Sequence, residues 1–169
     1  MASERGLIGS ILIIILTGGL MGLIVLVVRD TPNSLPGDFV YPVKDVVENL
    51  KLAQYELEYV ERTNIYLNMT QARLTEIERL IEKRNKDKEI IATIQRLLDV
   101  QAKAITNLGR AKTQGGNIYP LFDKLESILQ EEQNVLPELI FDLSQPATEA
   151  INKVIDQSEI DLERLNSMR

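Results

Sequence analysis

The chain has 169 residues and a net charge of −6, and it contains neither histidine nor cysteine. Without histidine, a Ser–His catalytic pair and an imidazole metal cluster are excluded, and without cysteine, a thiolate nucleophile and a structural zinc site are excluded. The acidic pair Glu131-Glu132 and the acidic group from Asp156 to Glu163 lack the spacing of a calcium loop, so we expect solvated faces there. The sequence therefore predicts no catalytic residues, no cofactor and no metal site.

An uncharged run of 22 residues extends from Leu7 to Val28. A helix of this length spans roughly 33 Å, which is enough to cross a hydrocarbon core of about 30 Å. We therefore expect a transmembrane helix at residues 7–28 after a short cytoplasmic N-terminus at residues 1–6. Two alternatives stay open: a cleaved secretory signal, which is usually shorter and ends in a small-residue cleavage site, and a pilin-type leader.

Gly18 and Gly22 lie four positions apart inside this run. Small residues at this spacing let two membrane helices approach closely, so the pair is a candidate helix–helix contact. Glycine is also common in membrane helices without such a role. The Lys and Arg residues near the two ends of the run favour neither orientation in the membrane.

Residues 29–42 form a proline-rich strap between the expected membrane helix and the first soluble helix. Pro36-Gly37 fits the centre of a type II turn with glycine at positive φ, and Pro42 fits the first turn of a helix. We expect Phe39 and Tyr41 to pin the strap onto the helical domain, the alternative being a plain linker. The strap motif comprises Pro36, Gly37, Asp38, Phe39, Tyr41 and Pro42.

Residues 43–166 are typical of consecutive amphipathic helices. The first apolar stripe recurs at three and four residues, continues over residues 65–81 after a phase slip, and comprises Val43, Val46, Val47, Leu50, Ala53, Leu57 and Val60. Further stripes predict a helix over residues 90–108, one beginning at Pro120 with a kink at Pro137, and one beginning near Pro146. The predicted fold class is all-α: one N-terminal transmembrane helix followed by an antiparallel bundle of four to five helices.

Two sets of residues are candidate partner surfaces in this domain. Three tyrosines lie at spacings of four and seven, and either form a partner surface or lie buried at a helix seam: Tyr55, Tyr59 and Tyr66. A basic stretch is a candidate contact for lipid headgroups or an anionic polymer, unless it simply attracts the acidic C-terminal third: Lys83, Arg84, Lys86 and Lys88.

The strap also carries a family resemblance. Residues 35–44, from Leu35 to Lys44, resemble the P-G-D-x-x-Y-P opening of a bacterial family of unknown function, and the likeness continues to about residue 160. Members of that family are helical, lie outside the cytoplasmic membrane behind a membrane helix, and occur in anti-sigma-factor-like proteins and in stand-alone anchored proteins. The resemblance implies a single-pass protein of the bacterial cytoplasmic membrane, with the N-terminus inside and the helical domain outside. It assigns no catalytic residues, and six residues before the expected anchor leave no cytoplasmic sigma-binding module.

These observations favour a non-enzymatic, membrane-anchored, extracytoplasmic interaction module, for example an accessory subunit of a membrane or envelope assembly. One alternative is an extracytoplasmic stress or ligand sensor that signals through a partner, and another is a pilin-like filament subunit. The expected partners are membrane lipid and another membrane or envelope protein, or a second copy of the chain. We expect no nucleic-acid partner.

Overall fold

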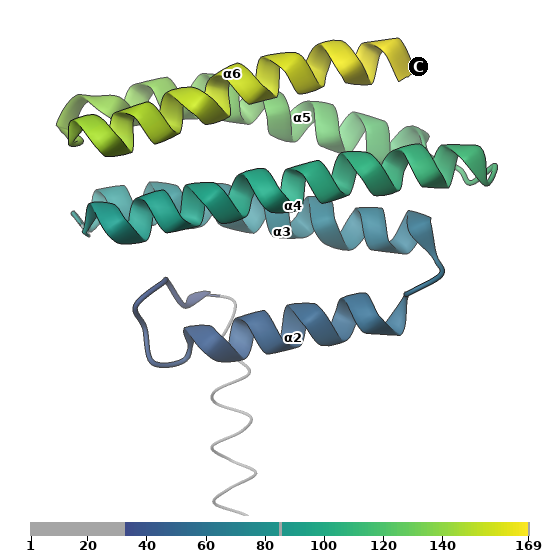
Figure 1. Ribbon diagram of the computed structural model, residues 1–169, viewed down its shortest axis with the longest axis horizontal. Helices are drawn as coiled ribbons and strands as arrows, with labels where there is room; N and C mark the ends of the chain where they lie inside the picture. The colour runs from purple at the N-terminus through teal and green to yellow at the C-terminus, as the bar shows by residue number, and fades with distance from the viewer. Residues whose placement is uncertain (1–32, 85, 169) are drawn as a thin grey trace, which may run out of the picture. The chain divides into compact units, whose positions relative to one another are not determined.

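The computed structural model describes residues 33–84 and 86–168 (Figure 1). This part of the chain contains no strand, and its helices are α2 (Tyr41–Gln54), α3 (Tyr59–Glu82), α4 (Asp87–Thr113), α5 (Tyr119–Val135), the 3-10 helix η2 (Leu136–Asp142) and α6 (Gln145–Met168). The all-α prediction is confirmed for these residues. The expected transmembrane helix at residues 7–28, with Gly18 and Gly22, lies outside the described residues. Within residues 33–84 and 86–168, no helix combines the length and the apolar character needed to cross a membrane.

The chain divides into two compact units, Met1–Val47 and Glu48–Arg169. In the first unit the strap forms the predicted turn: the Asp38 N–H donates to the Leu35 carbonyl (2.9 Å) and Gly37 has a φ of 99°. The Asp38 carboxylate accepts a second bond from the Leu35 N–H (2.7 Å), which closes the turn from the other side. Pro42 is the second residue of α2, as predicted for a proline in the first turn of a helix.

The two aromatic residues of the strap differ in exposure. Tyr41 is 5% exposed, whereas Phe39 is 97% exposed, so the prediction that both side chains pack is wrong for Phe39. Phe39 occupies a central position of the next turn, in which the Tyr41 N–H donates to the Asp38 carbonyl (3.1 Å). Central residues of a tight turn lie at its tip, away from the chain that enters and leaves. Leu35, which the sequence pattern did not single out, is buried instead.

In the second unit, α3 to α6 form two stacked helical hairpins (Figure 1). Helices that follow one another along the chain run antiparallel, as predicted for the bundle. Between the hairpins α3 packs against α5 and α4 packs against α6, so these neighbours run in the same direction. Apolar side chains from all four helices fill the centre, among them Leu67, Leu108, Phe122, Leu125, Leu129 and Leu165.

A Schellman motif ends α4, four residues beyond Gly109. Gly115 has a φ of 75°, its N–H donates to the Lys112 carbonyl (3.0 Å), and the Gly116 N–H donates to the Ala111 carbonyl (3.1 Å). The helix therefore continues through Gly109, beyond the predicted end at residue 108. Gly116 also lies tightly packed, because a Cβ there would come within 2.7 Å of Val60 Cγ2.

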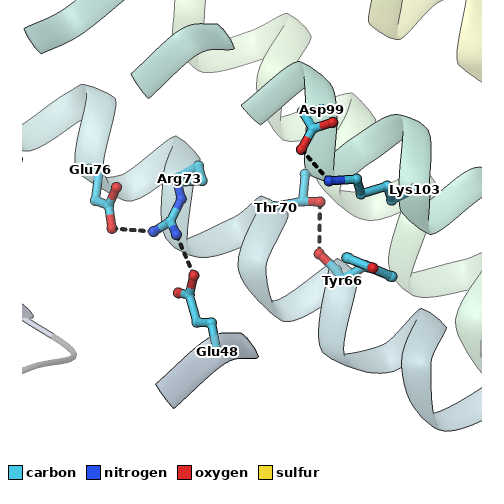
Figure 2. A network of polar contacts seen from close by, with 7 residues as sticks. All are labelled: Glu48, Tyr66, Thr70, Arg73, Glu76, Asp99 and Lys103. Atoms are coloured by element: carbon cyan, nitrogen blue, oxygen red, sulfur yellow. Dashed lines mark hydrogen bonds and ion pairs between the residues drawn. The ribbon is translucent and has the colours of Figure 1, made fainter. Parts of the chain in front are cut away.

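The first apolar stripe is mostly turned to solvent. Val46, Leu50 and Leu57 are exposed, so the prediction that this stripe is a core face is wrong at these positions. In the second unit a polar contact holds α2 instead. Figure 2 shows the guanidinium of Arg73 on α3 between Glu48 of α2 and Glu76, whose Oε1 is 2.7 Å from Arg73 Nη1. Glu48 lies two positions from both Val46 and Leu50, so turning it toward Arg73 turns the apolar residues outward.

Candidate binding pocket

A pocket of about 570 Å³ lies where the connection between α3 and α4 meets η2. Its apolar lining comes from the end of α3, the first turn of α4 and η2 with the residue after it: Ile81, Ile90, Leu139, Phe141 and Leu143. Its charged lining consists of three carboxylates and one guanidinium: Glu82, Asp87, Glu138 and Arg84. A volume of this size is within the range of sites that bind a small ligand or a side chain.

Two breaks in regular helix shape this pocket. Pro137 is the second residue of η2. Because proline has no N–H to donate within a continuing α-helix, α5 ends before it and the chain tightens into a 3-10 helix. The predicted kink at Pro137 is thus a change of helix type. Arg84 lies in the left-handed region with a φ of 51°, and its N–H donates to the Ile81 carbonyl (2.9 Å). This conformation costs about 1 kcal/mol in a residue other than glycine and lets the chain reverse after α3.

The charged groups of the pocket have no partner among themselves. Within residues 33–84 and 86–168, no ion pair joins Arg84 to Glu82, Asp87 or Glu138, and none of the three carboxylates pairs with another cation. Phe141 is 90% exposed beside them. An unpaired charge and a solvent-facing aromatic ring at the same hollow leave both kinds of contact available to a ligand.

A second polar group lies inside the bundle and shares no residue with the pocket. Glu132 on α5 is fully buried, and its two carboxylate oxygens have no hydrogen-bond partner in the described part of the chain. Burial raises the pKa of Glu132 to about 8, and repulsion by Asp161 and Glu131 adds to the effect. Asp161 on α6 accepts hydrogen bonds from Gln101 Nε2 (2.9 Å) and Gln157 Nε2 (3.1 Å). Glu132 is therefore a neutral carboxylic acid at pH 7.

The prediction that these acidic residues form solvated faces is wrong for Glu132 and Asp161. Their positions in the helices explain it: Glu132 follows Leu125 by seven residues and Leu129 by three, and Asp161 follows Val154 by seven. Both carboxylates therefore continue the buried stripe of their own helix. The sequence contains this signal, since a polar residue at a core position stands out against its apolar neighbours. Among the described residues, no group of three or more Asp, Glu, His or Cys side chains is arranged to hold a metal ion.

The three tyrosines do not form one exposed surface. Tyr66 is buried in the core, and its hydroxyl lies 3.5 Å from Arg62 Nη2. Tyr59 is partly buried against the same core, and the Arg110 guanidinium lies 5.6 Å from its ring centroid. Tyr55 is half-buried in the turn between α2 and α3. Tyr66 therefore fits the interpretation of burial between helices. Because its side chain is buried, it is not part of a partner surface.

The basic stretch is exposed at the connection between α3 and α4. Lys83, Arg84, Lys86 and Lys88 are all exposed, and of these only Arg84 lines the pocket. Glu138 and Phe141 also line the pocket and were not among the predicted site residues. A signal for them exists, because the apolar run Leu139-Ile140-Phe141 follows Pro137 directly and is too short to continue the helix. What the sequence could not give is that this run lies next to the end of α3.

Residues 33–167 match the family model of a domain of unknown function, DUF5667. The chain belongs to the DUF5667 family. This agrees with the predicted membership of an uncharacterised family, while the strap motif and the link to anti-sigma-factor-like proteins stay predictions. No curated protein and no solved structure matches the chain. The DUF5667 match extends from before α2 almost to the end of α6, so the pocket and the buried Glu132 both lie within the family domain.

Proposed function

We propose that this DUF5667 protein is a non-enzymatic interaction module that binds a segment of a partner protein in the pocket between η2 and the α3–α4 connection. The observation that carries the proposal is the combination of apolar walls, unpaired charged groups and the exposed ring of Phe141 in one hollow. A binding role fits the sequence, which has no histidine or cysteine to serve as a nucleophile or a metal ligand. Glu132, the group with the strongly raised pKa, is fully buried in the bundle and does not line the pocket.

A photo-crosslinking residue at position 141, expressed in the full chain in cells, tests this proposal. Tyr119 is the matched control, because it is also an exposed aromatic residue (74%) but lies at the beginning of α5. We expect one dominant crosslinked protein from position 141 and not from position 119. Equal crosslinking at both positions, or none at position 141, would contradict a partner site at this pocket.

We further propose that residues 7–28 anchor the protein in the bacterial cytoplasmic membrane, with the helical domain outside. The uncharged run and the family resemblance of the strap support this arrangement. Protease added to spheroplasts should then remove the domain beyond residue 30 without lysis. Protection of the domain until the cells are lysed would reverse the topology.

A second candidate function is an extracytoplasmic sensor that signals through a partner, which the resemblance to anti-sigma-factor-like proteins favours. Under this function, deletion of the gene changes transcription during envelope stress. A deletion strain with the transcript profile of its parent under that stress would refute it. The pocket then serves as the site at which the sensor meets its partner.

A further inference from the structure

We infer that the pocket selects a peptide segment in which a lysine or arginine lies next to an apolar side chain. This inference rests on the proposed function and names the chemistry of the partner segment. It follows from three features of the pocket: carboxylates outnumber cations in its lining, no ion pair joins these charged groups to one another, and apolar side chains line the same hollow.

The charge balance of the lining favours a cation. Glu82, Asp87 and Glu138 outnumber the single guanidinium of Arg84, and no ion pair within the described residues neutralises any of them. An incoming ammonium or guanidinium group gains charge-assisted hydrogen bonds to these carboxylates without first breaking an existing pair. An anionic group, such as a lipid phosphate, meets three like charges in the same hollow. Lys83, Lys86 and Lys88 do not line the pocket, so their ammonium groups are not among the groups that a ligand inside it contacts.

The apolar wall sets the second requirement. Ile90 is almost fully buried and Leu139 is half-buried, so they form a fixed wall, whereas Phe141 is open to solvent. An apolar side chain placed against Leu139 and Phe141 removes this surface from water, at about 25 cal/mol for each Å². A free lysine or a small polyamine offers the charge without this contact. The pocket therefore favours a short basic–apolar segment of a polypeptide over a simple cation.

Three labelled peptides serve as probes: Gly-Lys-Leu-Lys-Gly, Gly-Lys-Gly-Lys-Gly and Gly-Glu-Leu-Glu-Gly. The full chain is placed in phosphatidylcholine nanodiscs, which carry no net charge, and binding is measured by fluorescence anisotropy. We expect the Lys-Leu-Lys peptide to bind about tenfold more tightly than the Glu-Leu-Glu peptide and more tightly than the Lys-Gly-Lys peptide. Equal affinities for the first and the third peptide, or a preference for the glutamate peptide, would overturn the inference.

A pair of double variants with the same net charge locates the effect. Glu82→Gln/Glu138→Gln should weaken binding of the Lys-Leu-Lys peptide about tenfold and flatten its salt dependence. The control Glu159→Gln/Glu163→Gln changes two exposed carboxylates on α6 and should leave affinity unchanged. Glu82→Lys/Glu138→Lys should reverse the preference toward the glutamate peptide, with circular dichroism showing that each variant keeps its helical content. If the control weakens binding as much as the pocket variant, the inference is wrong.

The two experiments test the partner site and its preference for a cationic segment independently. Crosslinking at position 141 together with no charge preference among the peptides would leave the partner site in place and refute the cationic ligand. Selective binding of the lysine peptide together with no crosslink at position 141 would support the ligand chemistry and refute the proposed partner site in cells.

Discussion

Replacing Glu132 by glutamine should stabilise the helical domain at neutral and alkaline pH. Glu132 is fully buried, and its carboxylate oxygens lack hydrogen-bond partners among residues 33–84 and 86–168. Above its pKa the folded protein must hold a negative charge at this position, close to the carboxylate of Asp161. Glutamine has nearly the same shape and stays neutral at every pH, so the substitution removes the charge with little change in packing.

The size of the effect follows from proton linkage. The pKa of Glu132 is about 8 in the folded protein against an ordinary value of 4.5, so the folded state binds the proton more tightly than the unfolded state. The contribution of this group is therefore fully present below about pH 4.5 and is lost as the pH rises through about pH 8. The full loss corresponds to about 5 kcal/mol, of which about 3 kcal/mol has occurred at pH 7.

Urea unfolding of the full chain and of Glu132→Gln, followed by circular dichroism between about pH 5 and about pH 9, measures this contribution. The difference in the free energy of unfolding between the two proteins should change by several kcal/mol over that range, in favour of glutamine at high pH. Glu159→Gln is the matched control, because it makes the same chemical change at an exposed glutamate outside the core. The free energy of unfolding of this control should depend on pH in the same way as that of the parent. Parallel profiles for Glu132→Gln and the parent would refute the reasoning.

Three further predictions follow from buried or tightly packed side chains. Arg73→Ala should lower the free energy of unfolding by about 3–5 kcal/mol in urea unfolding, because it leaves the Glu48 and Glu76 carboxylates without their common partner; a loss below about 1 kcal/mol would contradict a buried ion pair. Gly116→Ala should lower stability by about 1–3 kcal/mol through its contact with Val60, and adding Val60→Ala should recover part of that loss in a double-mutant cycle. Tyr41→Ala should lower the melting temperature while Phe39→Ala leaves it unchanged, since Tyr41 is buried and Phe39 is exposed; equal shifts would mean that the strap aromatics act as a pair.

The helices were predictable because the spacing of apolar residues and the glycines and prolines that mark helix ends agree along most of the chain. Gly37 takes the positive φ expected after Pro36, and the glycines at 115 and 116 end α4 with the hydrogen bonds of a Schellman motif. These features depend only on residues next to one another, so a single sequence contains the necessary information. The pocket does not have this property, because Glu82 and Glu138 are 56 positions apart and meet only through the stacking of the two hairpins.

Polar residues at buried helix positions account for most differences between the predicted and the observed core. Acidic residues were expected outside the bundle, but Glu76, Glu132 and Asp161 are buried in α3, α5 and α6, and the apolar Ile160 of α6 is exposed. On α2, Val46 and Leu50 are exposed, whereas the carboxylate of Glu48 pairs with the buried guanidinium of Arg73. Periodicity gives the phase of such a helix but not which of two faces packs.

The two kinds of buried charge in this domain have opposite consequences for stability. Arg73 is held between Glu48 and Glu76, so each charge has an opposite charge beside it, and separating them is costly. Glu132 is fully buried and is repelled by the carboxylates of Asp161 and Glu131, so it avoids the same cost by keeping its proton. A neutral carboxylic acid retains one O–H to donate, and Gln101 Oε1, a buried acceptor with no partner in the described part of the chain, lies in the same cluster. A proton on Glu132 therefore removes a buried charge and supplies a donor where the bundle has an excess of acceptors, which is why glutamine, itself a neutral donor, is the substitution that best preserves this part of the core.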